Sequence, residues 1–208
     1  MLMPSRNIFL IFGVVALFGL GIFLTIDKDP EIKNYPSNGT DIIAFGDSLV
    51  SGVGSSRDGG FVDLLSQKIG REIINLGVPG NTTEDGLKRL SQLDKYKPKV
   101  VIILLGGNDH LRKVPIDTTF ENLETLVRGI QDRGAVVLLL GVKGNLFGDK
   151  FKSRFEDLSE KYGTAYVPDV LSGLFGNPKY MSDAIHPNDL GYTKITDKIY
   201  PVFLSLIN

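Results

Sequence analysis

The chain has 208 residues, of which 42% are hydrophobic and 23% charged, and its formal net charge is −1. This composition is that of a globular protein with about one domain, and the near-zero charge argues against a nucleic-acid partner. The absence of cysteine excludes disulfides, thiolate metal sites, cysteine nucleophiles and lipid attachment to cysteine, and any imidazole chemistry depends on His110 or His186.

The first predicted element is an apolar segment at the N-terminus. Residues 7–26 carry no charge, and about 20 such residues can span a bilayer. We predict a membrane anchor or a signal segment over residues 1–26, with Arg6 on the cytoplasmic side. An uncleaved anchor of the bacterial type would hold the rest of the chain outside the cytoplasm, whereas a cleaved signal would leave it secreted or periplasmic. Residues 27–38 are polar, contain two prolines and predict a linker to a domain over residues 39–208.

Short apolar runs alternate with helical patterns through this domain. The apolar and β-branched runs predict five strands, at 42–45, 72–76, 100–105, 135–140 and 165–167. Apolar residues at helical spacing predict five helices, at 61–69, 82–93, 119–133, 150–162 and 188–206. This alternation indicates an α/β fold with a parallel sheet between two layers of helices, and such sheets carry their sites at the carboxyl ends of the strands.

The loop after the first strand has a glycine-rich turn that could bind a phosphate or present a nucleophile. A phosphate-binding loop requires a lysine directly after its last glycine, and none occurs there when the motif is counted from Gly46 or from Gly54. The dinucleotide fingerprint fails as well, because Arg57 stands where its last glycine belongs. The sequence therefore favours a nucleophile in this loop.

Ser48, in the same loop, has the partners that a nucleophilic serine needs. A serine hydroxyl is activated by a base, and that base is oriented by a third group. Asp183 lies three residues before His186, so on a tight loop its carboxylate can hold one ring nitrogen while the other faces Ser48. Pro187 keeps His186 out of helical geometry. We predict Ser48, Asp183 and His186 as the catalytic residues.

Acyl transfer also requires hydrogen-bond donors for an oxyanion. We predict that these are the backbone N–H groups of Ser48 and Gly80 and the side-chain amide of Asn108, although glycine and asparagine are also common turn residues. We assign five neighbouring residues to substrate binding: Asp47, Val78, Asp109, His110 and Ile185. Asp47 and Asp109 are also expected to stabilise the turns in which they lie. No cluster of His, Asp and Glu indicates a metal site, and no cofactor is expected.

Taken together, four stretches of the chain resemble the SGNH hydrolases, also called GDSL esterases/lipases. The stretches run in the order of that family's Ser, Gly, Asn and His blocks: Phe45 to Leu49, Asn75 to Thr82, Gly106 to Asp109 and Asp183 to Pro187. The stretch Leu105 to Arg112 is most similar to the branch of arylesterases and of acyl-CoA thioesterase I/lysophospholipase L1. The resemblance implies a flavodoxin-like sheet of about five parallel strands, a shallow site, and a serine hydrolase that forms an acyl-enzyme at Ser48.

The resemblance leaves the substrate open among short acyl esters, thioesters and lysophospholipids, either as small molecules or in a membrane. One alternative is an O-acetyl esterase or an acyltransferase acting on envelope polysaccharide, and another is an envelope-binding module without catalysis. The glycine-rich segment Gly141 to Asp149 departs from the branch and is expected to form a different wall of the site.

Overall fold

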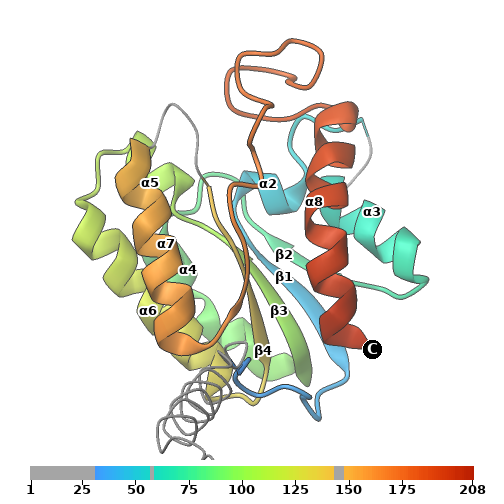
Figure 1. Ribbon diagram of the computed structural model, residues 1–208, viewed down its shortest axis with the longest axis vertical. Coiled ribbons are helices and arrows are strands. Elements are labelled where there is room, and N and C mark those ends of the chain that lie inside the picture. The colour runs from blue at the N-terminus through green and yellow to red at the C-terminus, as the bar shows by residue number, and fades with distance from the viewer. Residues whose placement is uncertain (1–30, 57–58, 143–147) are drawn as a thin grey trace, which may run out of the picture. The chain divides into compact units, whose positions relative to one another are not determined.

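Five apolar segments pair as a parallel sheet in the order β2-β1-β3-β4-β5 (Figure 1). Their bounds are β1 (Asp41–Gly46), β2 (Ile74–Gly77), β3 (Pro98–Leu104), β4 (Val136–Leu140) and β5 (Ala165–Val167). The structure is a computed structural model that describes residues 31–56, 59–142 and 148–208. β1, β3 and β4 are buried along nearly their whole length, as strands between two helical layers must be.

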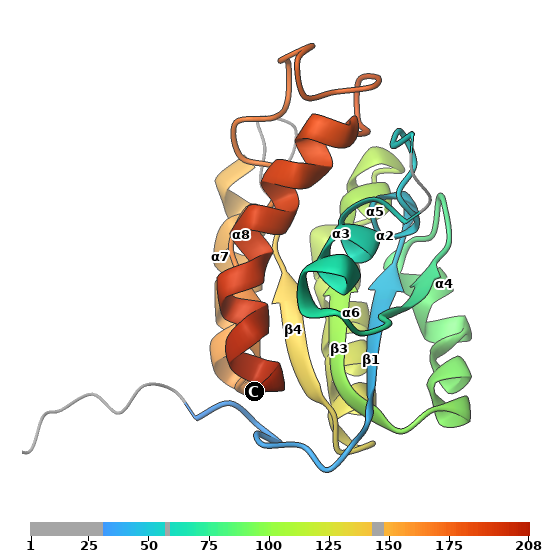
Figure 2. The same ribbon diagram turned by 90° about the vertical axis from the view of Figure 1, so that its right-hand side faces the viewer.

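Helices cover both faces of the sheet (Figures 1 and 2). One layer contains α3 (Gly60–Ile69) and α8 (Asp189–Ile207), which pack against each other. The other layer contains α4 (Thr83–Lys88), α6 (Ile116–Gln131) and α7 (Gly148–Tyr162). The predicted three-layer α/β/α sandwich is therefore confirmed.

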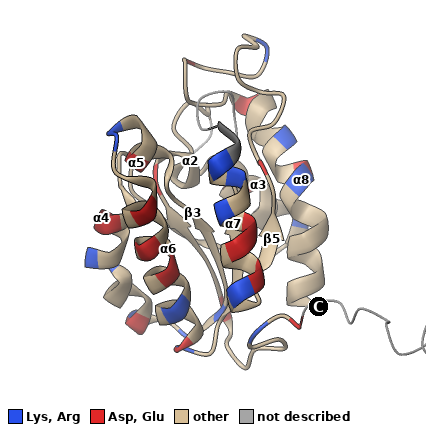
Figure 3. Cartoon of the chain, turned by 60° about the vertical axis from the view of Figure 1, so that its left-hand side comes forward, with Lys and Arg blue, Asp and Glu red and all other residues tan. Residues whose placement is uncertain are grey.

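The core lies between the sheet and the apolar faces of these helices. On α6 the predicted inward residues Leu123, Leu126, Val127 and Ile130 have no exposed surface. Burying one such side chain contributes about 1.5–3 kcal/mol. Charged residues gather instead on the outward faces of α4, α6 and α7 (Figure 3), which is the division that an amphipathic helix requires.

Several predicted boundaries are wrong. The helix predicted over 82–93 ends at Lys88, and a 3₁₀ helix, η1 (Leu90–Lys95), follows. β2 begins at Ile74, two residues later than predicted, while β3 begins at Pro98, which is tolerated as a first strand residue. Two short helices were not predicted, α2 (Ser48–Ser51) and α5 (Gly107–Leu111).

The N-terminal boundary of the domain also differs from the prediction. The compact unit begins at Ile32, because part of the predicted linker binds to it. The Asn34 side chain donates to the carbonyls of Gln131 at 2.8 Å and Ala135 at 3.0 Å. The predicted segment over residues 1–26 lies outside the described residues, and none of the helices described is long and apolar enough to cross a membrane.

Candidate active site

Ser48 lies where β1 ends, as the first residue of α2. Only a glycine fits at residue 46, because a Cβ there would lie 2.3 Å from the carbonyl oxygen of Leu104 in the neighbouring strand β3. Asp47 begins the turn, and its carboxylate accepts a hydrogen bond of 3.0 Å from the N–H of Leu49. The hydroxyl of Ser48 is thus held at the carboxyl end of β1, between β2 and β3.

The loop before α8 brings His186 to Ser48. The Nε2 of His186 lies 3.0 Å from the Oγ of Ser48, and its Nδ1 lies 2.7 Å from a carboxylate oxygen of Asp183. The other oxygen of Asp183 accepts from the N–H groups of Ile185 at 2.8 Å and His186 at 2.7 Å. The structure therefore brings the three predicted catalytic residues together in the predicted order of contacts.

Asp183 is held as a carboxylate by these contacts. Its hydrogen bond with His186, followed by that from the Ile185 N–H, lowers its pKa to about 2. An ionised Asp183 accepts the proton on Nδ1, which leaves Nε2 of a neutral His186 free to accept the proton of Ser48. The Asp183 side chain is 52% exposed, whereas that of His186 is only 16% exposed.

The loop after β2 forms a tight turn beside Ser48. The N–H of Asn81 donates to the carbonyl of Val78 at 3.1 Å, and Gly80 has a φ of 80°. Pro79 in the second position and a glycine with positive φ in the third are the residues of a type II turn. Within the described part of the chain, the N–H groups of Ser48 and Gly80 have no backbone acceptor.

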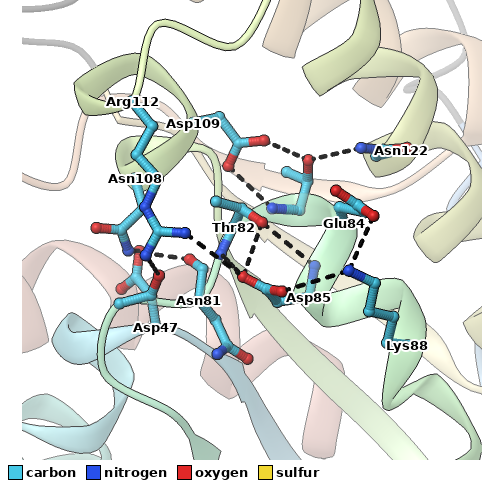
Figure 4. A network of polar contacts seen from close by, with 12 residues as sticks. Asp47, Asn81, Thr82, Glu84, Asp85, Lys88, Asn108, Asp109, Arg112 and Asn122 are labelled. Atoms are coloured by element: carbon cyan, nitrogen blue, oxygen red, sulfur yellow. Dashed lines mark hydrogen bonds and ion pairs between the residues drawn. The ribbon is translucent and has the colours of Figure 1, made fainter.

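Asn108, in the first turn of α5, faces both loops (Figure 4). Its side-chain NH₂ donates to the carbonyl of Asn81 at 2.9 Å and lies 3.4 Å from the carboxylate of Asp47. The second contact is long for a hydrogen bond, so one amide hydrogen of Asn108 is only weakly held. The three predicted oxyanion donors come from the ends of three neighbouring strands.

Asp47 is almost completely buried behind the nucleophile, with 4% of its surface exposed. Burial raises its pKa to about 7, against the opposing effects of the Leu49 N–H and of the His186 charge. Its carboxylate borders the cavity beside Ser48 but also braces the turn, as expected.

The structure corrects the assignment of Asp109 to substrate binding. Asp109 has no exposed surface, and its carboxylate accepts from the N–H of Thr83 at 2.9 Å and from the Thr83 hydroxyl at 2.5 Å. Asn122 in turn donates to that hydroxyl (Figure 4). Asp109 therefore fastens α5 to the start of α4 and cannot contact a substrate.

A small apolar cavity of about 40 Å³ lies beside Ser48 and His186. At roughly 10–15 Å³ per water it holds only a few water molecules. Apolar side chains from separate parts of the chain form its walls: Leu49, Leu111, Val142, Leu171, Phe175 and Ile185. Of these only Ile185 was predicted, because the others belong to loops and helix ends whose sequences carry no motif.

Two other predicted substrate contacts lie outside this cavity as far as the described residues define it. Val78 is 39% exposed on the type II turn, and the ring of His110 packs edge-on against Phe151, with 5.5 Å between ring centres. Of the expected wall Gly141 to Asp149, Val142 lines the cavity, and residues 143–147 lie outside the described part. In the described ranges, no three His, Asp or Glu side chains gather as a metal site would require.

Comparison with known proteins places this geometry in a family. Residues 44–194 match the GDSL-like Lipase/Acylhydrolase family, and this range contains all of the site residues above. The chain belongs to the GDSL-like lipase/acylhydrolase family. This confirms the resemblance that the four sequence blocks indicated.

Individual members of the GDSL-like family agree with this assignment. Esterase TesA of Pseudomonas aeruginosa is 30% identical over 80% of this chain and 89% of the esterase. An arylesterase of Vibrio mimicus is 31% identical over 70% of this chain and 79% of the arylesterase. A crystal structure of TesA superposes with a TM-score of 0.73 at 28% identity, covering 81% of this chain and all of that structure.

Proposed function

We propose that this chain is a serine hydrolase that cleaves carboxylic esters through an acyl-enzyme at Ser48. One observation carries the proposal: His186 lies 3.0 Å from the Ser48 hydroxyl through one nitrogen and 2.7 Å from Asp183 through the other. This is the arrangement that a serine nucleophile requires, and the esterases among the relatives support it.

In the first step the Oγ of Ser48 forms a bond to the ester carbonyl carbon while His186 takes its proton. The carbonyl π electrons move to oxygen and form an oxyanion. When the oxyanion collapses, the bond to the alcohol breaks and His186 gives its proton to the leaving oxygen. Asp183 remains ionised throughout and stabilises the charged imidazole, which its lowered pKa permits.

In the second step water attacks the acyl-enzyme. His186 takes a proton from the water, a second oxyanion forms, and its collapse releases the carboxylic acid and returns the proton to Ser48. The donors proposed for both oxyanions are the N–H groups of Ser48 and Gly80 and the weakly held amide hydrogen of Asn108. Removing one such donor costs about 10²–10³ in rate.

The small cavity favours short acyl groups as substrates. Its walls are apolar, and its volume of about 40 Å³ between the described residues suits a short acyl group. Thioesters and lysophospholipids offer the same carbonyl chemistry. A panel of acyl chain lengths assayed beside acetylated glycans separates these substrates from the removal of O-acetyl groups. Analysis of products with a sugar acceptor present detects transfer to a sugar hydroxyl.

For the N-terminal segment we keep the proposal of a membrane anchor or a cleaved signal, which rests on the uncharged residues 7–26. Either would put the hydrolase domain outside the cytoplasm. The mass of the mature chain in membrane and soluble fractions decides between them, since cleavage removes about 26 residues.

The function is tested with wild type and Ser48→Ala on p-nitrophenyl esters of increasing chain length. We expect wild type to prefer short chains and Ser48→Ala to lose all but a residual rate, with an unchanged melting temperature. A fluorophosphonate should label Ser48 in wild type only. Full esterase activity in Ser48→Ala would refute the mechanism.

A further inference from the structure

Arg89 separates α4 from η1, at the point where the predicted helix 82–93 breaks. Its backbone, with φ −115° and ψ 10°, leaves helical geometry. Its guanidinium turns toward the sheet and lies over the ring of Phe45, 3.9 Å from the ring centre. Burial of this group lowers its pKa, but an arginine remains charged at any pH where the fold exists.

Three acceptors from three separate segments surround this guanidinium. Its Nη2 donates to the carbonyl of Gly46 at 2.7 Å, and its Nη1 donates to the carbonyl of Leu76 at 2.9 Å. Its Nε donates to the side-chain oxygen of Asn81 at 2.6 Å. One positive charge thus joins the ends of β1 and β2 to the type II turn.

Two of these three contacts are one or two residues from a proposed oxyanion donor. Gly46 precedes Ser48 by two residues, and Asn81 directly follows Gly80. The carbonyl of Asn81 also accepts the hydrogen bond that orients the amide of Asn108. Arg89 itself is not among the residues that line the cavity within the described chain.

We propose that Arg89 is a positioning residue that fixes the distances among the three oxyanion donors. This inference rests on the proposed hydrolase function. An oxyanion hole works only when its donors are held in place before charge develops. The planar guanidinium presents several donors in a fixed geometry, whereas a lysine ammonium is a single point that cannot bond three separated acceptors in the same way.

The test compares Arg89→Met and Arg89→Lys with Arg133→Met as a matched control. Arg133 also donates to a carbonyl, that of Gly129 at 2.6 Å, and to Asp94 at 2.7 Å, but it lies just before β4, at the opposite end of the sheet. We expect Arg89→Met to lower kcat about 10- to 100-fold, less than the roughly 10²–10³ of a lost donor. KM should change less than about threefold, Arg89→Lys should restore only part of kcat, and Arg133→Met should retain it.

A second readout separates positioning from general damage to the fold. An alkyl boronic acid forms a tetrahedral, anionic adduct with a serine nucleophile, and we expect Arg89→Met to weaken its binding as much as it lowers kcat. Asn81→Ala removes one of the three acceptors without changing the arginine. If Arg89→Met does not fold, Asn81→Ala should still show the loss of kcat at nearly constant KM.

The outcomes distinguish this inference from the function on which it rests. If wild type is active and Arg89→Met has the same kcat, the inference is overturned and the proposed function stands. If Arg89→Met does not fold, an unchanged kcat in Asn81→Ala has the same consequence. Full restoration by Arg89→Lys also overturns it, because charge without the three-way geometry would then suffice. A wild type that neither hydrolyses esters nor reacts with a fluorophosphonate at Ser48 overturns the proposed function and the inference together.

Discussion

Replacing Asp47 with asparagine should stabilise the protein at neutral and alkaline pH. Burial raises the pKa of Asp47 from its ordinary 3.8 to about 7, so the folded chain binds a proton there more tightly than the unfolded chain does. The stability that this group contributes is complete below pH 3.8 and is lost as the pH rises to about 7. Asparagine has no charge to bury, and its amide oxygen can still accept from Leu49.

The size of the effect follows from the two pKa values. Each tenfold difference in proton affinity is worth about 1.4 kcal/mol, so the difference between 3.8 and about 7 corresponds to about 4 kcal/mol. The free energy of unfolding of Asp47→Asn minus that of wild type should therefore increase by about 4 kcal/mol between pH 4 and pH 8.

Urea unfolding of both proteins at several pH values measures this difference, and subtracting wild type removes the contributions of all other titrating groups. The control is Asp63→Asn, because Asp63 lies in the first turn of α3 and bonds to Gln67 on the surface. The difference in free energy of unfolding between Asp47→Asn and wild type could instead stay constant from pH 4 to pH 8. That result would show that Asp47 is not held in an unfavourable charged state above pH 7.

Two further substitutions test the remaining parts of the site. Asp183→Asn should lower kcat about 10³–10⁴-fold, because an asparagine favours the wrong tautomer of the His186 imidazole. Because the pKa of Asp183 is about 2, the pH–rate profile of wild type should show no ionisation of this group above pH 4. Gly80→Ala forces a Cβ onto a φ of 80° and should cost about 1 kcal/mol of stability together with a fall in kcat. The control is Gly134→Ala, because Gly134 has a similar φ of 78° and open space around it. Calorimetry should show a similar loss of stability in this control, and kinetics should show that it retains kcat. A normal kcat in Gly80→Ala would remove this turn from the oxyanion hole.

The sequence was sufficient to predict the layers of the fold and the contact between Asp183 and His186, because both depend on local patterns. Residues 100–104 of β3 and the whole of β4 are runs of β-branched residues and leucine, which are favoured in buried strands. Asp183 and His186 are three residues apart, and on a tight loop this spacing is enough to bring the carboxylate against the imidazole.

Features that depend on contacts between distant segments could not be predicted. The apolar pattern of 82–93 continues through Arg89, and the helix ends there because that side chain bonds to the ends of two strands. Asp109 is adjacent to an oxyanion residue in sequence, but Thr83 and Asn122 decide its role. Asn34 belongs to a segment with the composition of a linker, and its bonds to the carbonyls of Gln131 and Ala135 help to attach that segment to the domain.

The two hydrogen bonds of His186 differ greatly in how much chain they enclose. The bond to Asp183 spans 3 residues, whereas the contact with Ser48 spans 138. Closing a long loop is costly in entropy, and contacts between residues so far apart in sequence form slowly. Catalytic activity should therefore return only in the last kinetic phase of refolding. The rate of ester hydrolysis during refolding then reports when the native topology is complete.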